Sequence, residues 1–162
     1  MGVVNMSNAG TATLPAPAQQ VRRLTALRRA SLASLVMLVV QFALGVGVNL
    51  YVSLPAAGSG GRKISQAFTD GPALALHVVL GLLLIVSAIG LLVQAIIARH
   101  SRVIVLAALG LVAIAGAAAQ GFSFVHNSTN AASMGMAVAT AVAMLCYVVT
   151  LFIVRAPGGG LD

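Results

Sequence analysis

The sequence predicts an all-α membrane protein, folded as an antiparallel four-transmembrane-helix bundle. Of the 162 residues, 60% are hydrophobic and only 7% are charged, whereas a soluble domain carries roughly 25% charged residues. Four apolar runs meet the requirement of roughly 20 residues for a helix that crosses a bilayer. They cover about residues 33–54, 73–98, 103–125 and 131–154. Short linkers between the last three runs make consecutive helices antiparallel neighbours.

The first helix follows an N-terminal tail. Residues 1–20 are small, polar and proline-bearing, and they predict a disordered cytoplasmic segment before a membrane domain over residues 21–155. The first apolar run is long enough to span and lacks the short core and cleavage site of a signal peptide, so we expect it to stay in the protein. Within it Gln41, Gly45 and Asn49 share one face. That face should point into the bundle, because an amide exposed to lipid is costly.

The other three helices are bounded by turn signals. Pro72 suits the first helical position of the second helix, and the segments ARHSR and HNSTN form tight turns on either side of the third. Stripes of small residues on the third and fourth helices predict packing seams in lipid. These stripes are Ala113, Ala117 and Gly121, and Ala131, Gly135, Ala139 and Ala143. Residues 156–162 are predicted to be a short cytoplasmic tail.

The basic residues predict the orientation. Lys and Arg number four before the first helix, two in ARHSR and one after the fourth helix, against two in the first loop and none in HNSTN. The positive-inside rule therefore predicts a multi-pass protein of the inner (plasma) membrane with both termini in the cytoplasm. The excess of Arg over Lys, with abundant Ala and Gly, indicates a bacterial coding bias.

Several function classes are disfavoured. The charges flank the apolar runs instead of forming a phosphate-binding patch, and there is no Trp, so no nucleic-acid partner is expected. No Asp, Glu, Lys or Arg lies within the four runs, which weakens a transporter interpretation because exporters usually need an embedded carboxylate. The single cysteine, Cys146, excludes an intramolecular disulfide. No catalytic motif appears, and the sequence favours a protein that is not an enzyme.

His77 is the strongest candidate for a functional residue, because it lies inside the apolar run ALALHVVLGLLLIVSAIG. It is about one turn into the second helix, and Gly81 leaves space on the same side. His126 follows the third run at the same, outer side. Two histidines on different helices can ligate the iron of a haem in a bundle core. The alternative is that His77 hydrogen-bonds an amide such as Asn49, with His126 as an interfacial loop residue.

Three segments resemble heme A synthase-type proteins. VVQFALGVGVNLYVSLP resembles the family's first helix, where a Gln and a following LG pair are typical, and VLAALGLVAIAGAAAQGFSFV is similar to the third. HVVLGLLLIVSAIGLL resembles the helix that carries the family's first haem-ligating histidine, which corresponds to His77. The resemblance covers roughly residues 33–150, one four-helix half of that eight-helix family. It implies b-type haem binding at the outer side, with electron transfer or haem handling as the function.

The sequence departs from this family at two points. The family's second ligand lies early in the fourth helix, where this chain reads NAASMGMAVA, and the acidic residue beside the first ligand is absent. His126 is the preferred second ligand, and Met134 is the reserve because Met can also bind haem iron. The departures imply a haem-binding half or a haem-free relative instead of a haem A synthase.

The main alternative to haem binding is a non-enzymatic accessory subunit, or a protein that binds a quinone or lipid in the bundle. The face formed by Gln41 and Asn49 and the small-residue seams suit that role without any metal. In either case the lipid bilayer is the expected partner, and a membrane protein complex or a homo-oligomer stays open.

Overall fold

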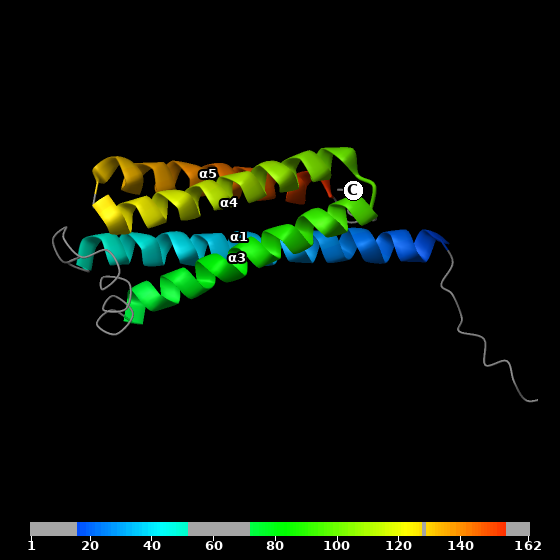
Figure 1. Cartoon of the computed structure of the whole chain (residues 1–162). Helices are drawn as coiled ribbons and strands as arrows, with labels where there is room; N and C mark the ends of the chain where they lie inside the picture. The colour runs from blue at the N-terminus through cyan, green and yellow to red at the C-terminus, as the bar shows by residue number, and fades with distance from the viewer. Residues whose placement is uncertain (1–15, 52–71, 128, 155–162) are drawn as a thin grey trace, which may run out of the picture.

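The chain folds into four long helices, and the structure, a computed structural model, describes residues 16–51, 72–127 and 129–154. The helices are α1 (Ala16–Tyr51), α3 (Pro72–Ile97), α4 (Ser101–Asn127) and α5 (Asn130–Ile153) (Figure 1). No strand occurs in these ranges, so the predicted all-α four-helix bundle is confirmed. Each helix contains at least 18 residues apolar enough to cross a membrane, which supports a multi-pass membrane protein.

The predicted spans 73–98, 103–125 and 131–154 lie within two residues of α3, α4 and α5, whereas the predicted end of the first span, at residue 54, lies outside the described ranges. α1 begins at Ala16, inside the stretch 1–20 predicted to be a tail, and its 36 residues make it about 54 Å long. Between residue 16 and the apolar run that starts near residue 33, Ala, Leu, Arg and Gln favour helix. Leu27 and Ser31 in this part are 1% and 0% exposed because they pack against the bundle. Residues 1–15 and the predicted tail 156–162 lie outside the described ranges.

A tight turn connects α3 to α4. Arg99 has a φ of 54°, in the left-handed region that glycine usually occupies after a helix. The N–H of His100 donates to the carbonyl of Ala95 at 3.4 Å, and the N–H of Arg99 donates to Ile96 at 3.0 Å, which is the hydrogen-bond pair of a Schellman motif. The His100 carbonyl then accepts from the N–H of Ile104 at 3.0 Å and starts α4.

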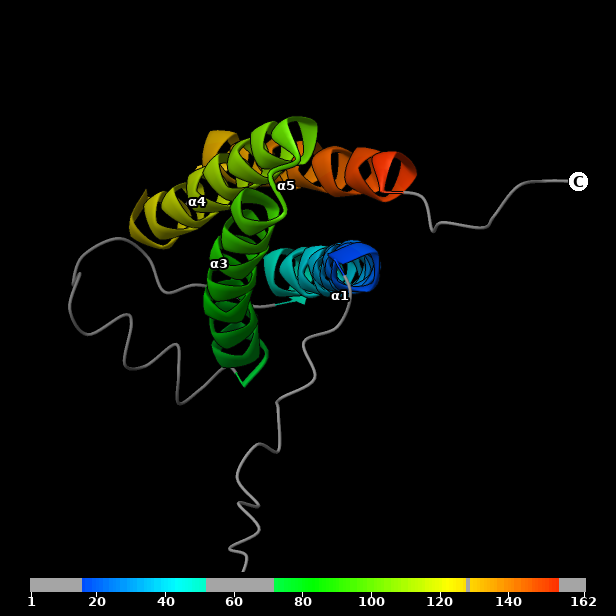
Figure 2. The same ribbon diagram turned by 90° about the vertical axis from the view of Figure 1, so that its right-hand side faces the viewer.

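The four helices form a ring in which each packs against two neighbours. α1 contacts α3 and α5, and α4 contacts α3 and α5, with α4 and α5 the most extensively packed pair. Figures 1 and 2 show that α3 crosses α1 at an angle, while α4 and α5 lie together as a second pair. The pair α1–α3 and the pair α4–α5 therefore separate toward one end of the bundle.

The hydrophobic core lies mainly toward the other end, which we call the arginine end. The arginine end is the end that carries the six described arginines: Arg22, Arg23, Arg28, Arg29, Arg99 and Arg102. Small side chains bring the helices close there, with Ala88, Ala95, Ala107 and Ala143 all 0% exposed. Tyr147, also 0% exposed, fills the space that Gly110 leaves.

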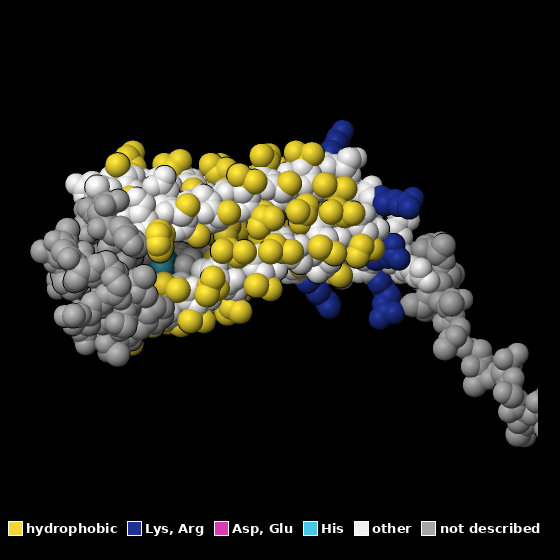
Figure 3. All heavy atoms as spheres, in the orientation of Figure 1, with side chains coloured by type: hydrophobic (Ala, Val, Ile, Leu, Met, Phe, Trp, Pro, Cys, Tyr) yellow, Lys and Arg dark blue, Asp and Glu magenta, His cyan; other side chains and the backbone are white. Residues whose placement is uncertain are grey.

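The outer surface of the bundle is apolar between its two ends. Figure 3 shows hydrophobic side chains over most of the visible face, with the arginines of the described ranges at the arginine end. Large side chains such as Val86, Val112 and Phe152 are 67–69% exposed. In water such a surface would drive aggregation, whereas in a bilayer it is the surface that lipid chains cover.

Candidate functional site

A cavity of about 510 Å³ lies where the two helix pairs separate, at the end opposite the arginine end. This volume is within the range of roughly 300–1,000 Å³ that small-molecule sites occupy. All four helices line the cavity, and most of its surface is apolar. Figure 3 shows histidine atoms in a hollow near this end of the bundle. The polar side chains in the lining are few: Gln41, Asn49, His77, Ser133 and Thr140.

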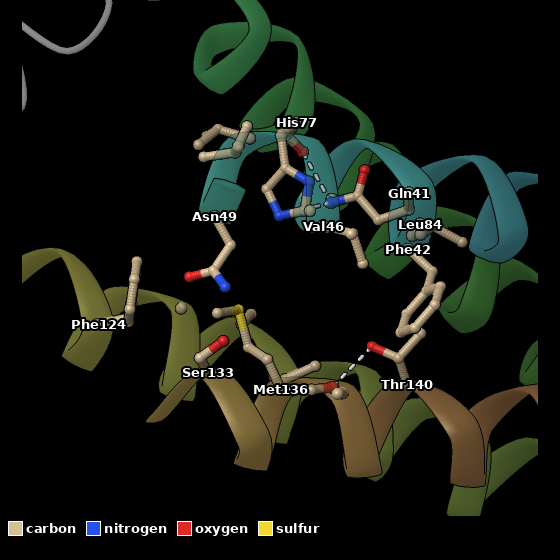
Figure 4. Close-up of a pocket in the computed structure, with 18 of the residues that line it drawn as sticks. Gln41, Phe42, Val46, Asn49, His77, Leu84, Phe124, Ser133, Met136 and Thr140 are labelled. Atoms are coloured by element: carbon tan, nitrogen blue, oxygen red, sulfur yellow. Dashed lines mark hydrogen bonds between the residues drawn. The ribbon is translucent and has the colours of Figure 1, made fainter. Parts of the chain in front are cut away.

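Gln41 of α1 and His77 of α3 form the polar centre of the cavity. The Gln41 Nε2 atom donates to the backbone carbonyl of His77 at 2.8 Å and lies 3.3 Å from the His77 Nε2 atom (Figure 4). The face of Gln41, Gly45 and Asn49 was predicted to point into the bundle, and all three line the cavity, so that prediction is confirmed.

The two contacts of Gln41 determine how its amide and the imidazole carry their protons. If the Gln41 amide were turned over, its oxygen would face the His77 carbonyl oxygen at 2.8 Å, which is repulsive; the nitrogen must therefore be on this side. The second N–H of the same amide then points to the His77 Nε2 atom, which has to accept. In the neutral imidazole the proton is consequently on Nδ1.

This arrangement leaves two buried polar atoms without a partner among the described residues. They are the Oε1 atom of Gln41 and the Nδ1 atom of His77. The first is an acceptor and the second is a donor, and both belong to residues that line the cavity. An unpaired buried polar group costs about 1–3 kcal/mol, and this cost would be recovered by a ligand that pairs with them.

Two glycines allow the Gln41–His77 pair to form. A Cβ atom at Gly45 would lie 3.0 Å from the Cε1 atom of His77, and one at Gly81 would lie 3.1 Å from the Nε2 atom of Gln41. Both contacts are tighter than nine in ten contacts of real Cβ atoms, so the imidazole lies close against the backbone of α1. Gly81 was expected to leave space beside His77, and the space is used by the Gln41 amide.

The opposite wall of the cavity comes from α4 and α5. Figure 4 shows the Asn49 amide pointing from α1 toward Ser133 and the thioether of Met136 on α5. The Sδ atom of Met136 packs against Gly121 of α4, where a Cβ would lie 3.2 Å away. The Thr140 hydroxyl donates to the Met136 carbonyl at 2.8 Å, so its hydrogen is already used. Asn49 and Ser133 are therefore the polar groups that this side adds to the cavity.

The structure brings only one of the three predicted site residues into the described site. His77 lines the cavity. The backbone of His126 belongs to the last turn of α4, but its side chain lies outside the part of the chain that the structure describes. Met134 is 71% exposed and is not in the cavity lining, whereas Met136 is. No cluster of three or more His, Cys, Asp or Glu side chains suited to a metal occurs in the described residues.

The sequence predicted the role of neither Gln41 as the partner of His77 nor Met136 as a cavity residue. The only indication in the sequence was that Gln41 lies on the face of α1 that was predicted to point into the bundle. Comparison of the chain with family models, with curated proteins and with solved structures finds no match. The function therefore has to be inferred from the chemistry of the cavity.

Proposed function

We propose that this membrane protein binds a lipid-soluble molecule of the quinone type in the cavity, without being an enzyme. The observation that carries the proposal is the unpaired donor and acceptor, His77 Nδ1 and Gln41 Oε1, buried in two residues that line a mostly apolar cavity. A quinone carbonyl can accept from the Nδ1–H, and a quinol hydroxyl can donate to Oε1. The ring and tail of such a molecule match the apolar walls.

The surroundings of the cavity support a ligand that arrives through the membrane. Several lining side chains are also exposed on the outside of the bundle, among them Leu50, Leu82 and Phe122, which are 60–68% exposed. The cavity wall is thus continuous with the apolar outer surface. A molecule dissolved in the bilayer reaches the polar pair without crossing water.

The test is equilibrium binding of a decyl-tailed benzoquinone to the purified protein, by calorimetry in neutral detergent. His77→Ala and Gln41→Ala should each weaken binding about tenfold, as expected when a hydrogen bond worth about 1.4 kcal/mol is lost. His100→Ala and Gln94→Ala remove the same side chains outside the cavity and should leave binding unchanged. Equal affinities in all four variants, or no binding by the folded wild type, would contradict the proposal.

A second candidate ligand is b-type haem held by His77, and one feature of the cavity favours it. The thioether of Met136 points into the cavity from α5, on the wall facing α1 and α3 (Figure 4), and a His and a Met are an established pair of haem ligands. The haem would supply electron transfer. His77 Nε2 is engaged by Gln41 and Nδ1 carries the proton, so Gln41 has to move before the imidazole can bind iron.

A reduced-minus-oxidised absorption spectrum of protein expressed with ample haem distinguishes the two ligands. Haem binding predicts a Soret band that is lost in His77→Ala. Substitution of His126, Met134 or Met136 should alter the spectrum only for the residue that supplies the second ligand. A colourless, folded protein that binds the benzoquinone would reject haem and keep the first proposal. The proposed orientation, with both termini in the cytoplasm of the plasma membrane, places the cavity in the outer half of the bilayer.

A further inference from the structure

Six exposed arginines gather at the arginine end, and none of the residues that the structure describes beside them is acidic. The whole chain has two acidic residues, Asp70 and Asp162, and neither lies in the described ranges. Arg22, Arg23, Arg28 and Arg29 come from α1, and Arg99 and Arg102 come from the turn and the start of α4. Figure 3 shows these basic side chains around this end of the bundle. Their charge therefore needs a partner that the described protein does not supply.

A contact between α1 and α3 gives the depth of these arginines along the bundle. The Nη1 atom of Arg23 lies 3.4 Å from the carbonyl oxygen of Ile97, the last residue of α3. Arg28 and Arg29 follow five and six residues later on the same helix, about 7.5 and 9 Å further toward the middle of the bundle. Arg23 is thus level with the end of α3, and the other two are not.

Arg28 and Arg29 face outward at this depth. Leu27, the preceding residue, is 1% exposed and belongs to the hydrophobic core, whereas Arg28 and Arg29 are both exposed. Each residue turns the helix by about 100°, so Arg28 lies on the flank of α1 relative to Leu27, and Arg29 lies on nearly the opposite side. In a bilayer their guanidinium groups meet lipid where the neighbouring helices are still packed.

We propose that Arg28 and Arg29 form a binding site for the headgroup of an anionic phospholipid. A guanidinium at this depth is costly unless it pairs with an anion, and the lipid phosphate is the anion found at that level. Arginine binds phosphate through two parallel N–H donors, and two adjacent arginines attract a headgroup with net negative charge over a zwitterionic one. This site is independent of the cavity ligand, because it lies at the other end of the bundle.

Native mass spectrometry of the full chain in neutral detergent tests the proposal by titration with phosphatidylglycerol and phosphatidylcholine. The wild type should bind phosphatidylglycerol at least about fivefold more tightly than phosphatidylcholine, the change to which the contribution of a single arginine, about 1 kcal/mol, corresponds. The Arg28→Gln, Arg29→Gln double variant should lose this preference. The matched control, Arg99→Gln with Arg102→Gln, removes the same charge at the end of the bundle and should keep it.

If both double variants lose the preference for phosphatidylglycerol to the same extent, the effect comes from net charge and the proposed site is wrong. A wild type that binds the two lipids equally would also contradict the proposal. Arg28→Lys with Arg29→Lys guards against misfolding, because it keeps the charge and the packing. This variant should retain a weakened preference, since lysine lacks the paired donors of arginine. Complete loss in the lysine variant while its helix content is unchanged would also contradict the proposal.

Discussion

The Gly45–His77 contact shows how a single absent methyl group determines the geometry of the cavity. The imidazole lies against the backbone of α1, and any side chain at position 45 would require the ring to shift. The same holds on the facing helix, where Gly81 accommodates the Gln41 amide. The absence of a side chain at Gly45 and Gly81 therefore sets the positions of His77 and Gln41, and both glycines are positioning residues for the proposed ligand.

Gly45→Ala should displace the His77 ring and weaken benzoquinone binding, by more than the loss of a single hydrogen bond if Gln41 also moves. Overpacking of this kind costs about 1–3 kcal/mol. Calorimetric titration of the quinone measures the effect on binding, and denaturation with sodium dodecyl sulfate measures the effect on stability. Gly47→Ala is the control on the same helix, because a Cβ there meets nothing within 4 Å. Equal effects of both substitutions would refute the role given to Gly45.

Gly110 has a comparable function in the core, against Tyr147. A Cβ at Gly110 would lie 3.2 Å from two ring carbons of Tyr147, and this ring is 0% exposed and cannot swing aside. Gly110→Ala should therefore lower the free energy of unfolding by about 1–3 kcal/mol. Gly116→Ala, on the same helix with open space around it, should be neutral or slightly stabilising. Denaturant titrations of the two variants side by side provide the measurement.

At the scale of elements, the α3–α4 turn places an arginine where glycine is favoured. Arg99→Gly removes the steric cost of the left-handed conformation and should stabilise the protein by up to about 1 kcal/mol. Arg102→Gly makes the same chemical change inside the first turn of α4 and should destabilise by about 1 kcal/mol. Unfolding curves for both variants are the test, and effects of the same sign would show that backbone conformation does not decide the outcome.

The elements also show which features could be predicted. The predicted spans 73–98, 103–125 and 131–154 end within two residues of α3, α4 and α5, because in lipid the apolar length and the helix length coincide. α1 extends well before its apolar run, because its polar first half still has residues that favour helix and buries Leu27. The choice between Met134 and Met136 could not be made from sequence. Positions that are two residues apart differ by about 200° around a helix, and only the packing of the helix against its neighbours decides which of the two side chains faces inward.

For the whole molecule, the testable consequence of the charge distribution is its orientation. In a Cys146→Ala background, a Ser59→Cys variant should react with a membrane-impermeant maleimide added to intact cells. A Ser101→Cys variant, at the arginine end of α4, should react only after the cells are permeabilised. Labelling of the second variant alone in intact cells would reverse the predicted orientation and would move the cavity to the inner half of the bilayer.

The whole fold also explains why His77 could be singled out before its surroundings were known. An ionisable side chain in an apolar run has to face the interior, so its inward direction follows from solvation alone. The hydrogen-bond partner of His77 could not be predicted in the same way, because Gln41 and Asn49 share one face of α1 and either amide could pair with a histidine on a neighbouring helix. The angle at which α3 crosses α1 brings Gln41, and not Asn49, to the imidazole, and no local sequence pattern records that angle.

The separation of the two helix pairs has a mechanical consequence. The pairs are joined by closely packed small residues near the arginine end and diverge at the other, so they resemble two arms that meet at a fixed point. Lipid chains press on a membrane protein from the side, and that pressure acts to close the arms. A molecule in the cavity resists this closure as a wedge does. The occupancy of the cavity should therefore depend on how tightly the surrounding acyl chains are packed. The lipid composition of the bilayer then contributes to the affinity of the protein for its ligand.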